Sequence, residues 1–210
     1  MSTHIVVLPG GGYSSHTAHE SEPIVDWLES LGYSASVFRY PLQARHPGPL
    51  DAVREEIVAR RRDADHVGVM GFSAGGHLAG HAALAPDSTA EQRPDFAVLG
   101  YPITSMELPT YRSSQDILLG DSPSDQDRFV TSLDRLVTPG APPMFLWHTA
   151  EDSYVAVEHS YRLASALAAA GRPHCLHVFA HGPHGLGLAH GAGQAEGWTS
   201  LAAGWLAEQA

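Results

Sequence analysis

The sequence predicts an α/β protein with a mostly parallel sheet of about six strands flanked by helices. Short β-branched runs alternate with amphipathic segments through most of the 210 residues, which is the pattern of repeated β-α-β units. The hydrophobic fraction of 43% is sufficient for a sizeable core. One of the predicted connections carries Gly71-Phe-Ser-Ala-Gly75, a pattern typical of a sharp turn from a strand into a helix.

Length and charge limit the possible classes of protein. A chain of 210 residues favours a single domain over residues 1–210. The net charge of −11 argues against nucleic acid as a partner and against binding to an anionic membrane surface. Because Cys175 is the one cysteine, no internal disulfide forms, which favours a cytoplasmic location. The first residues lack a signal-peptide pattern, and no apolar stretch approaches the length of a membrane span.

The first expected strand, Ile5–Leu8, leads into three consecutive glycines at residues 10–12. Such a segment brings backbone N–H groups close to a ligand, so it could hold a phosphate or an oxyanion. The Lys-Ser/Thr pair of a phosphate-binding P-loop is absent, and the spacing of a dinucleotide-binding loop does not match. An oxyanion loop is therefore the preferred interpretation.

The remaining elements follow from local patterns. Apolar periodicity predicts helices over residues 22–31, 50–62, 76–84, 157–170 and 198–209. Apolar runs predict strands near residues 34–40, 67–70, 96–101, 143–148 and 175–180. In the last helix, Trp198, Leu201 and Trp205 fall at helical spacing, and this face is expected to pack on the sheet.

The alternation of strands and helices stops between residues 103 and 140. This segment is mostly polar, contains two short helical patterns at 114–119 and 125–136, and has no expected strand. Enzymes of this architecture often place a lid over the site in such an insertion. The alternative is a surface excursion without a function.

Ser73 is the candidate nucleophile. The flanking glycines, Gly71 and Gly75, leave room for a strained turn that holds the Ser73 hydroxyl at the end of the sheet. The N–H of Ala74 lies at the start of a helix, where it can stabilise a developing negative charge. The alternative is a glycine-rich turn with an ordinary serine, and it is weakened by the strand and helix on either side.

A serine nucleophile needs a base and an acid that orients the base. In this architecture the acid follows a late strand and the base follows the last one. Glu151 and Asp152 are the candidate acids, and Asp152 is favoured. Three histidines follow the last strand: His181, His184 and His190. His184 is favoured because it lies in the loop Gly182-Pro-His-Gly185, whose glycines let the imidazole reach toward Ser73, and His181 is the main competitor.

A second pair of histidines invites a metal-site interpretation. His77 and His81 are four residues apart on the helix after Ser73, as zinc ligands can be. No Glu follows His77 as the zinc-protease pattern requires, so packing or surface roles are expected instead. We expect neither a metal nor an organic cofactor.

These motifs together resemble the α/β-hydrolase superfamily, and within it the small serine esterases grouped with acetyl-xylan esterases and hormone-sensitive-lipase-like enzymes. The matching segments lie in the family order at residues 8–13, 71–79, 147–160 and 177–186. The resemblance implies a minimal α/β-hydrolase fold with a short lid insertion. It also implies Ser73 as nucleophile, Asp152 as acid and His184 as base, with the N–H groups of Gly11, Gly12 and Ala74 as oxyanion donors.

The sequence departs from this family at several points. Pro9 stands where many relatives have His, and the residue near the acid that is usually proline is Ala156. The first two strands of the full fold are missing, which leaves a new edge strand that a homodimer could protect. Glu20 is expected first as a helix-start residue or a loop anchor, and second as a substrate contact. Tyr13 directly follows the glycines and is expected to wall the acyl pocket.

The function that follows is a serine carboxylic ester hydrolase acting on a small-molecule ester through an acyl-enzyme intermediate. Short acyl groups, above all acetyl, are expected, and the alcohol could be a sugar. The alternative keeps the fold and the same three residues but makes the chain a tailoring enzyme: an acyltransferase, a lyase or a cyclase. A binding module is disfavoured, because it has no chemical need for Ser73, Asp152 and His184 together.

Overall fold

A six-stranded parallel sheet forms the centre of the computed structural model, which describes residues 2–209. The strand order is β2-β1-β3-β4-β5-β6, and every neighbouring pair is parallel. The strands are β1 (Thr3–Leu8), β2 (Ser34–Val37), β3 (His66–Phe72), β4 (Phe96–Gly100), β5 (Met144–Thr149) and β6 (His174–Phe179). The predicted fold class is confirmed. The single domain over 1–210 stays a prediction, and its first and last residues lie outside the described part.

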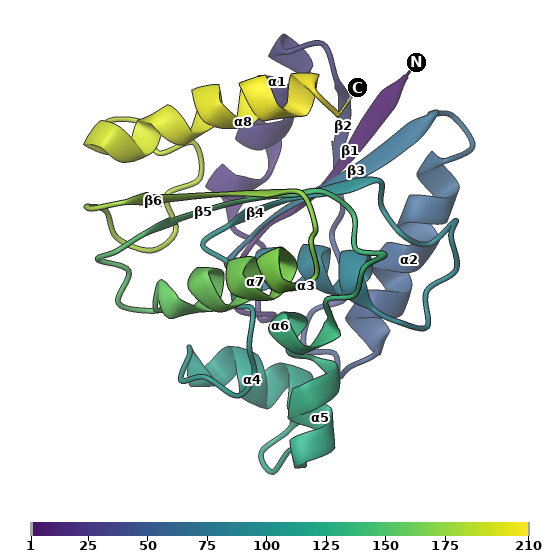
Figure 1. The fold of residues 1–210 in the computed structure, drawn as a ribbon, viewed down its shortest axis with the longest axis vertical. Helices are drawn as coiled ribbons and strands as arrows, with labels where there is room; N and C mark the ends of the chain where they lie inside the picture. The colour runs from purple at the N-terminus through teal and green to yellow at the C-terminus, as the bar shows by residue number, and fades with distance from the viewer. Residues whose placement is uncertain (1, 210) are drawn as a thin grey trace.

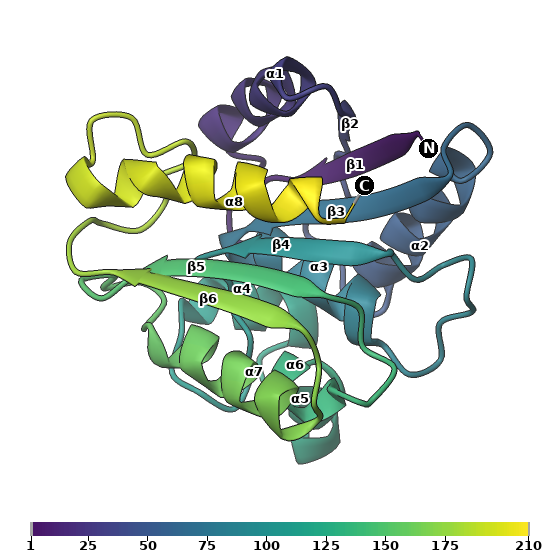
Figure 2. The ribbon, with the colours of Figure 1, turned by 45° about the horizontal axis from the view of Figure 1, so that its top comes forward.

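Helices cover both faces of the sheet (Figure 1). On one face lie α1 (Glu22–Ser30) and α8 (Trp198–Ala207); on the other lie α2 (Gly48–Arg60), α3 (Ser73–Leu84) and α7 (Glu158–Ala169). Figure 2 shows the same two layers from another angle. Each layer buries its own apolar cluster against the sheet, which is the general solution for a parallel sheet with two apolar faces.

The last helix corrects one predicted contact. The expected face of Trp198, Leu201 and Trp205 would have placed all three on the sheet, but Leu201 is 43% exposed. The buried positions of α8 are Trp198, Ala202, Trp205 and Leu206. The buried face of α8 therefore contains the positions four and seven residues after Trp198. Leu201, three residues after Trp198, lies outside this face.

The insertion forms a layer of its own beyond α3 and α7 (Figure 1). It holds α4 (Arg112–Leu119), α5 (Asp125–Val130) and α6 (Leu133–Leu136), so the helix predicted over 125–136 is broken. At the break, the hydroxyls of Thr131 and Ser132 donate to the carbonyls of Asp127 and Arg128 at 2.6 and 2.7 Å, and bonds of this kind to the preceding turn tend to bend a helix. Leu133 packs so closely on α3 that a Cβ at Gly80 would lie 2.4 Å from it.

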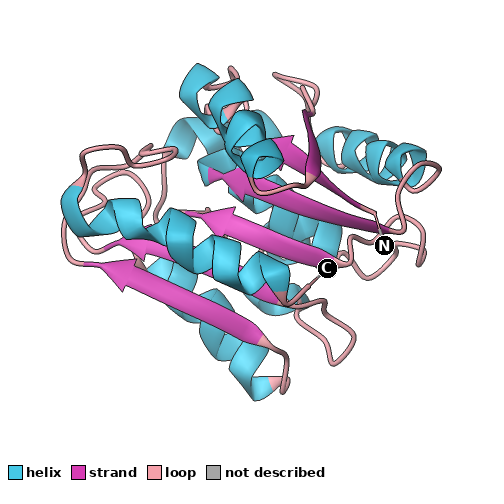
Figure 3. Cartoon of the chain, turned by 90° about the horizontal axis from the view of Figure 1, so that it is seen from above, coloured by secondary structure: helices cyan, strands magenta, loops and turns pink. Residues whose placement is uncertain are grey.

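The carboxyl ends of the strands gather at one edge of the sheet. Figure 3 shows the arrows of the longer strands ending along this edge. In a parallel sheet the loops at this edge build the ligand site. Here they are the loops after β1, β3, β4, β5 and β6. Among residues 2–209, no helix is both long and apolar enough to cross a membrane.

Candidate active site

Ser73 sits at the turn between β3 and α3. Its φ of 52° lies in the left-handed region that non-glycine residues rarely adopt. The turn requires glycine on both sides, because a Cβ at Gly71 would lie 2.2 Å from the carbonyl oxygen of Gly75. A Cβ at Gly75 would lie 2.1 Å from the carbonyl oxygen of Leu8, at the end of β1. The two glycines therefore allow α3 to start directly under the glycine loop.

The structure brings the three predicted residues Ser73, His184 and Asp152 into one hydrogen-bonded chain. His184 Nε2 lies 2.8 Å from Ser73 Oγ, and His184 Nδ1 lies 2.6 Å from Asp152 Oδ2. The Asp152 side chain is fully buried, whereas the His184 side chain keeps 17% of its surface exposed. The three side chains come from the start of α3 and from the loops after β5 and β6, which meet at the carboxyl edge of the sheet.

The other candidate residues have partners away from Ser73. Glu151 Oε1 lies 2.8 Å from His181 Nδ1, with side chains that are 57% and 82% exposed. His190 faces Glu196 at 3.3 Å on the surface. Each of these histidines already has a carboxylate partner away from Ser73.

The Asp152 carboxylate is held by more groups than the sequence indicates. Its Oδ1 accepts the backbone N–H groups of Tyr154 and Val155, both at 2.9 Å. Its Oδ2 lies 3.2 Å from Nε2 of His148, a fully buried residue at the end of β5 that sequence reasoning missed. Burial alone would raise the pKa of Asp152, but the hydrogen bonds from His148, His184 and the backbone outweigh it and lower that pKa.

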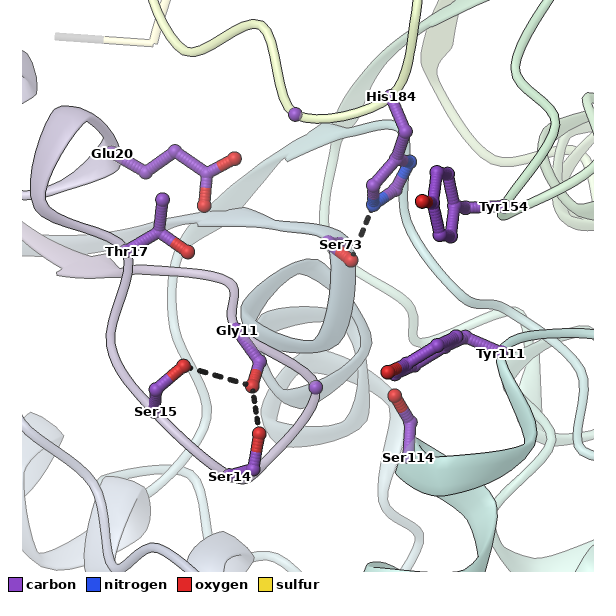
Figure 4. A pocket seen from close by; sticks show the side chains of 12 residues that line it. Gly11, Ser14, Ser15, Thr17, Glu20, Ser73, Tyr111, Ser114, Tyr154 and His184 are labelled. Atoms are coloured by element: carbon purple, nitrogen blue, oxygen red, sulfur yellow. Dashed lines mark hydrogen bonds between the residues drawn. The ribbon is translucent and has the colours of Figure 1, made fainter.

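The glycine loop turns its carbonyl groups away from Ser73. The Gly11 carbonyl accepts the N–H groups of Ser14 and Ser15 at 3.0 and 3.1 Å, and the Ser14 hydroxyl at 2.9 Å (Figure 4). Since the C=O and N–H of a trans peptide point in opposite directions, the N–H of Gly12 points away from this turn. Gly11 and Gly12 adopt positive φ angles of 117° and 63°.

Glu20 anchors the start of this loop. Its Oε2 accepts the N–H of Gly10 at 2.8 Å, and its Oε1 accepts the Tyr101 hydroxyl at 2.5 Å. The residue is only 2% exposed, yet it also contributes to the lining of the pocket around Ser73. The loop-anchoring role that the sequence suggested first is thus visible in the contacts of Glu20.

Tyr13 does not lie where the sequence predicted. It is fully buried, and its hydroxyl lies 2.6 Å from His77 Nδ1 beneath the loop, so its assignment as a substrate contact is wrong. The positive φ of 62° at Tyr13 turns its side chain into the core, away from the pocket. His77 uses its other ring nitrogen, Nε2, on the carbonyl of Thr131 at 2.7 Å. Within residues 2–209, no cluster of three His, Cys, Asp or Glu side chains could hold a metal ion.

Ser73 and His184 open into a cavity of about 310 Å³ (Figure 4). One side, called here the polar wall, consists of Ser14, Ser15, Thr17 and Glu20. The opposite side, called here the aromatic wall, consists of Tyr111 and Tyr154. Tyr111 belongs to the insertion, so this segment does contribute to the site. The sequence did not single out either tyrosine, because no local pattern brings them together.

Comparison with known protein families identifies the family of this chain. Residues 50–210 match the prolyl oligopeptidase family. The chain belongs to this family. The predicted resemblance to α/β hydrolases is thereby confirmed, and the order of the site loops along the chain agrees with it.

Two individual relatives match nearly the whole chain. This chain is 32% identical over 207 residues to endo-1,4-beta-xylanase B of Butyrivibrio fibrisolvens. The alignment covers 89% of this chain and 33% of that protein. The chain is 30% identical over 198 residues to the acetylxylan esterase of Xylanibacter ruminicola, covering 88% and 41%. The chain thus spans between a third and about two fifths of these relatives.

A solved structure gives the fold comparison. The acetyl ester-xyloside bifunctional hydrolase of Caldicellulosiruptor lactoaceticus superimposes with a TM-score of 0.92 at 38% identity. The alignment covers 99% of this chain and 83% of that protein. The six-stranded sheet and its helices are therefore those of an α/β hydrolase.

Proposed function

We propose that this chain is a serine carboxylic ester hydrolase that cleaves short-chain acyl esters, above all acetyl esters, through an acyl-enzyme. The observation that carries the proposal is the hydrogen-bonded chain from Ser73 through His184 to Asp152 at the base of an open cavity. This arrangement supplies a nucleophile, a base and an orienting acid.

The first half of the reaction forms the acyl-enzyme. His184 Nε2 takes the proton of Ser73 Oγ while Oγ attacks the carbonyl carbon of the ester. The oxyanion accepts hydrogen bonds from the N–H groups of Gly11, Gly12 and Ala74, and the α3 dipole adds to their effect. The tetrahedral intermediate then collapses, and the departing alcohol oxygen takes the proton from His184.

The second half releases the acid. Water loses a proton to His184 Nε2 and attacks the acyl carbonyl, and Ser73 Oγ leaves with that proton. Asp152 keeps the proton of neutral His184 on Nδ1, so that Nε2 faces Ser73 as a base. The two backbone donors on Asp152 Oδ1 and the lowered pKa of Asp152 keep this carboxylate ionised.

The relatives favour hydrolysis over the tailoring chemistries. Proteins named acetylxylan esterase and acetyl ester-xyloside bifunctional hydrolase are among them, so an acetylated sugar is the proposed substrate class. Among the described residues of the site, no contact favours an acyltransferase, a lyase or a cyclase. A cytoplasmic location and a homodimer through an edge strand of the sheet stay predictions from the sequence.

A direct assay tests the proposal. The purified protein is incubated with an aryl acetate, and the release of acetate and of the aryl alcohol is followed together. Equal release of both products that is lost in Ser73→Ala supports the proposal. Transfer of the acetyl group to a second alcohol without release of acetate would favour the acyltransferase instead.

A further inference from the structure

Two exposed tyrosines from distant parts of the chain meet at the mouth of the cavity. Tyr111 and Tyr154 are 48% and 60% exposed, and their rings meet edge to face with centroids 6.0 Å apart. Tyr111 comes from the insertion and Tyr154 from the loop after β5. Large exposed aromatic rings that converge on a cavity indicate a binding surface, because a monomer gains nothing by leaving them in water.

The chemistry of the leaving group indicates which half of the ester faces the two tyrosines. The alcohol oxygen must come within hydrogen-bond distance of His184 Nε2 to receive its proton. The ring of Tyr154 lies 5.9 Å from the His184 ring, centroid to centroid, on the aromatic wall of the cavity. The alcohol half of the ester therefore lies against the aromatic wall, and the acyl half lies toward the polar wall.

We propose that Tyr111 and Tyr154 form an alcohol-side subsite that binds the apolar face of a neutral ring alcohol, a pyranose. This inference rests on the proposed function and adds the residues that select the alcohol. A pyranose has an apolar C–H face that packs on aromatic rings and a polar rim of hydroxyls. The Ser114 hydroxyl beside Tyr111 is placed to meet such a rim (Figure 4).

The charge of the cavity agrees with a neutral ligand. Of the described residues that line it, none is Lys or Arg, and Glu20 contributes a carboxylate. An anionic alcohol would meet this carboxylate without a compensating cation. The cavity would therefore recognise the alcohol through contact with its ring and hydrogen bonds to its hydroxyl groups.

The kinetic test compares two acetates of different alcohols: an acetylated methyl xylopyranoside, whose alcohol is a ring, and 2-methoxyethyl acetate, whose alcohol is an open chain. We expect Tyr154→Ala and Tyr111→Ala to lower kcat/KM for the pyranoside at least about fivefold more than for the open-chain ester, which is the size of one lost aromatic contact. Tyr154→Phe keeps the ring face and should retain most of the preference. Tyr161→Ala, at a 47% exposed tyrosine on α7, is the matched control and should change neither value.

A binding measurement separates this proposal from the proposed function. In a Ser73→Ala background the intact acetylated pyranoside is titrated by NMR, and adding Tyr154→Ala should weaken its binding about fivefold or more. If the wild type cleaves neither ester while this binding still depends on Tyr154, the hydrolase proposal fails and the subsite stands. Equal losses for both esters, or a changed acyl-chain preference in place of a changed alcohol preference, would overturn the subsite.

Discussion

The Tyr101 hydroxyl donates a hydrogen bond to Glu20 Oε1 at 2.5 Å, and this contact joins the two loops on either side of Ser73. Glu20 holds the glycine loop through the N–H of Gly10. Tyr101 holds the His184 loop, because its hydroxyl accepts the N–H of Gly187 at 2.8 Å, and its ring meets the His184 ring with centroids 5.0 Å apart. Burial raises the pKa of Tyr101, so its hydroxyl stays protonated and available to donate.

Removing this hydroxyl should misplace the site without removing any reacting group. Tyr101→Phe leaves the Glu20 carboxylate with one donor and the Gly187 N–H without an acceptor, which should lower the free energy of unfolding by roughly 1–3 kcal/mol. We expect kcat for an aryl acetate to fall about ten- to a hundredfold with little change in KM, since Tyr101 would act as a positioning residue.

Tyr161→Phe controls for the loss of a phenol hydroxyl elsewhere, because Tyr161 is exposed on α7. Loss of stability in Tyr101→Phe with an unchanged kcat would show that the contact is structural only. A rise in KM as large as the fall in kcat would also contradict the positioning role.

The residues of the hydrogen-bonded chain should act as a unit. Ser73→Ala and His184→Ala should each lower kcat by about 10³ or more, and Asp152→Asn somewhat less. His181→Ala is the matched control, because His181 pairs with Glu151 on the surface and not with Ser73. Near-normal activity of His184→Ala together with an inactive His181→Ala would show that the base is His181.

The sequence predicted these residues because their signals are local. A serine between two glycines, an acid after a strand and a glycine-flanked histidine after the last strand are each readable within a few residues. The parallel sheet followed from the alternation of elements for the same reason. The prediction of the site and of the sheet depended on the order of short motifs along the chain. This order does not depend on the direction of individual side chains.

The sequence failed where side-chain direction decides the outcome. Tyr13 directly follows the three glycines at residues 10–12, but its positive φ turns it into the core. Tyr101, directly after β4, has a φ of 36°. The residue types at this point of the sequence do not predict a positive φ. The aromatic wall depends on how the insertion packs on α3, a contact between segments distant in the sequence.

The glycine of the turn gives a direct test of packing. In Gly75→Ala the new Cβ would lie 2.1 Å from the Leu8 carbonyl oxygen and 2.4 Å from that of Pro9, so the start of the glycine loop or α3 must shift. We expect a large loss of activity and a destabilisation of roughly 1–3 kcal/mol from overpacking.

Gly204→Ala in α8 is the matched control, because a Cβ there meets nothing within 4 Å. It should leave activity unchanged and stabilise by up to about 1 kcal/mol through helix propensity. Thermal melts and kcat/KM for an aryl acetate decide between the two. If Gly75→Ala were as active as Gly204→Ala, the close approach of the loop to α3 would not be needed for function.

Buried histidines should make the protein sensitive to mild acid. Burial lowers the pKa of His77 and His159 from 6.5 to about 4. Between these values the unfolded chain binds protons that the folded chain does not, so the free energy of unfolding falls as the pH drops from about 6.5 to 4. Each residue adds a slope of about 1.4 kcal/mol per pH unit at most. Asp152 does not add to this loss, because its lowered pKa removes stability only below its ordinary value of 3.8.

Urea unfolding at pH 7, 6 and 5 measures this slope. His77→Gln should be less stable at pH 7, because it disturbs the contacts to Tyr13 and Thr131, but its stability should fall less steeply toward pH 5. His190→Gln, at an exposed histidine, is the matched control for the loss of an imidazole. A slope in His77→Gln as steep as in the wild type would rule out His77 as a source of the acid sensitivity.

The acyl group should be short, although not for the reason that the sequence suggested. Tyr13 is buried and does not line the acyl pocket. The polar wall takes its place: an acyl chain that extends away from Tyr154 meets the hydroxyls of Ser14 and Thr17 and the Glu20 carboxylate. Each added methylene then forgoes about 0.8 kcal/mol of transfer free energy and covers polar groups that water would solvate.

We therefore expect kcat/KM to fall steadily from acetate through butyrate and hexanoate to octanoate esters of one aryl alcohol. A maximum at hexanoate or beyond would contradict a short acyl pocket. Thr17→Val removes a hydroxyl from the polar wall at nearly constant shape, so it should raise the butyrate-to-acetate ratio of kcat/KM a few fold, in line with about 1 kcal/mol for one polar group. An unchanged ratio in this variant would mean that space in the cavity, and not the polarity of this wall, limits the acyl chain.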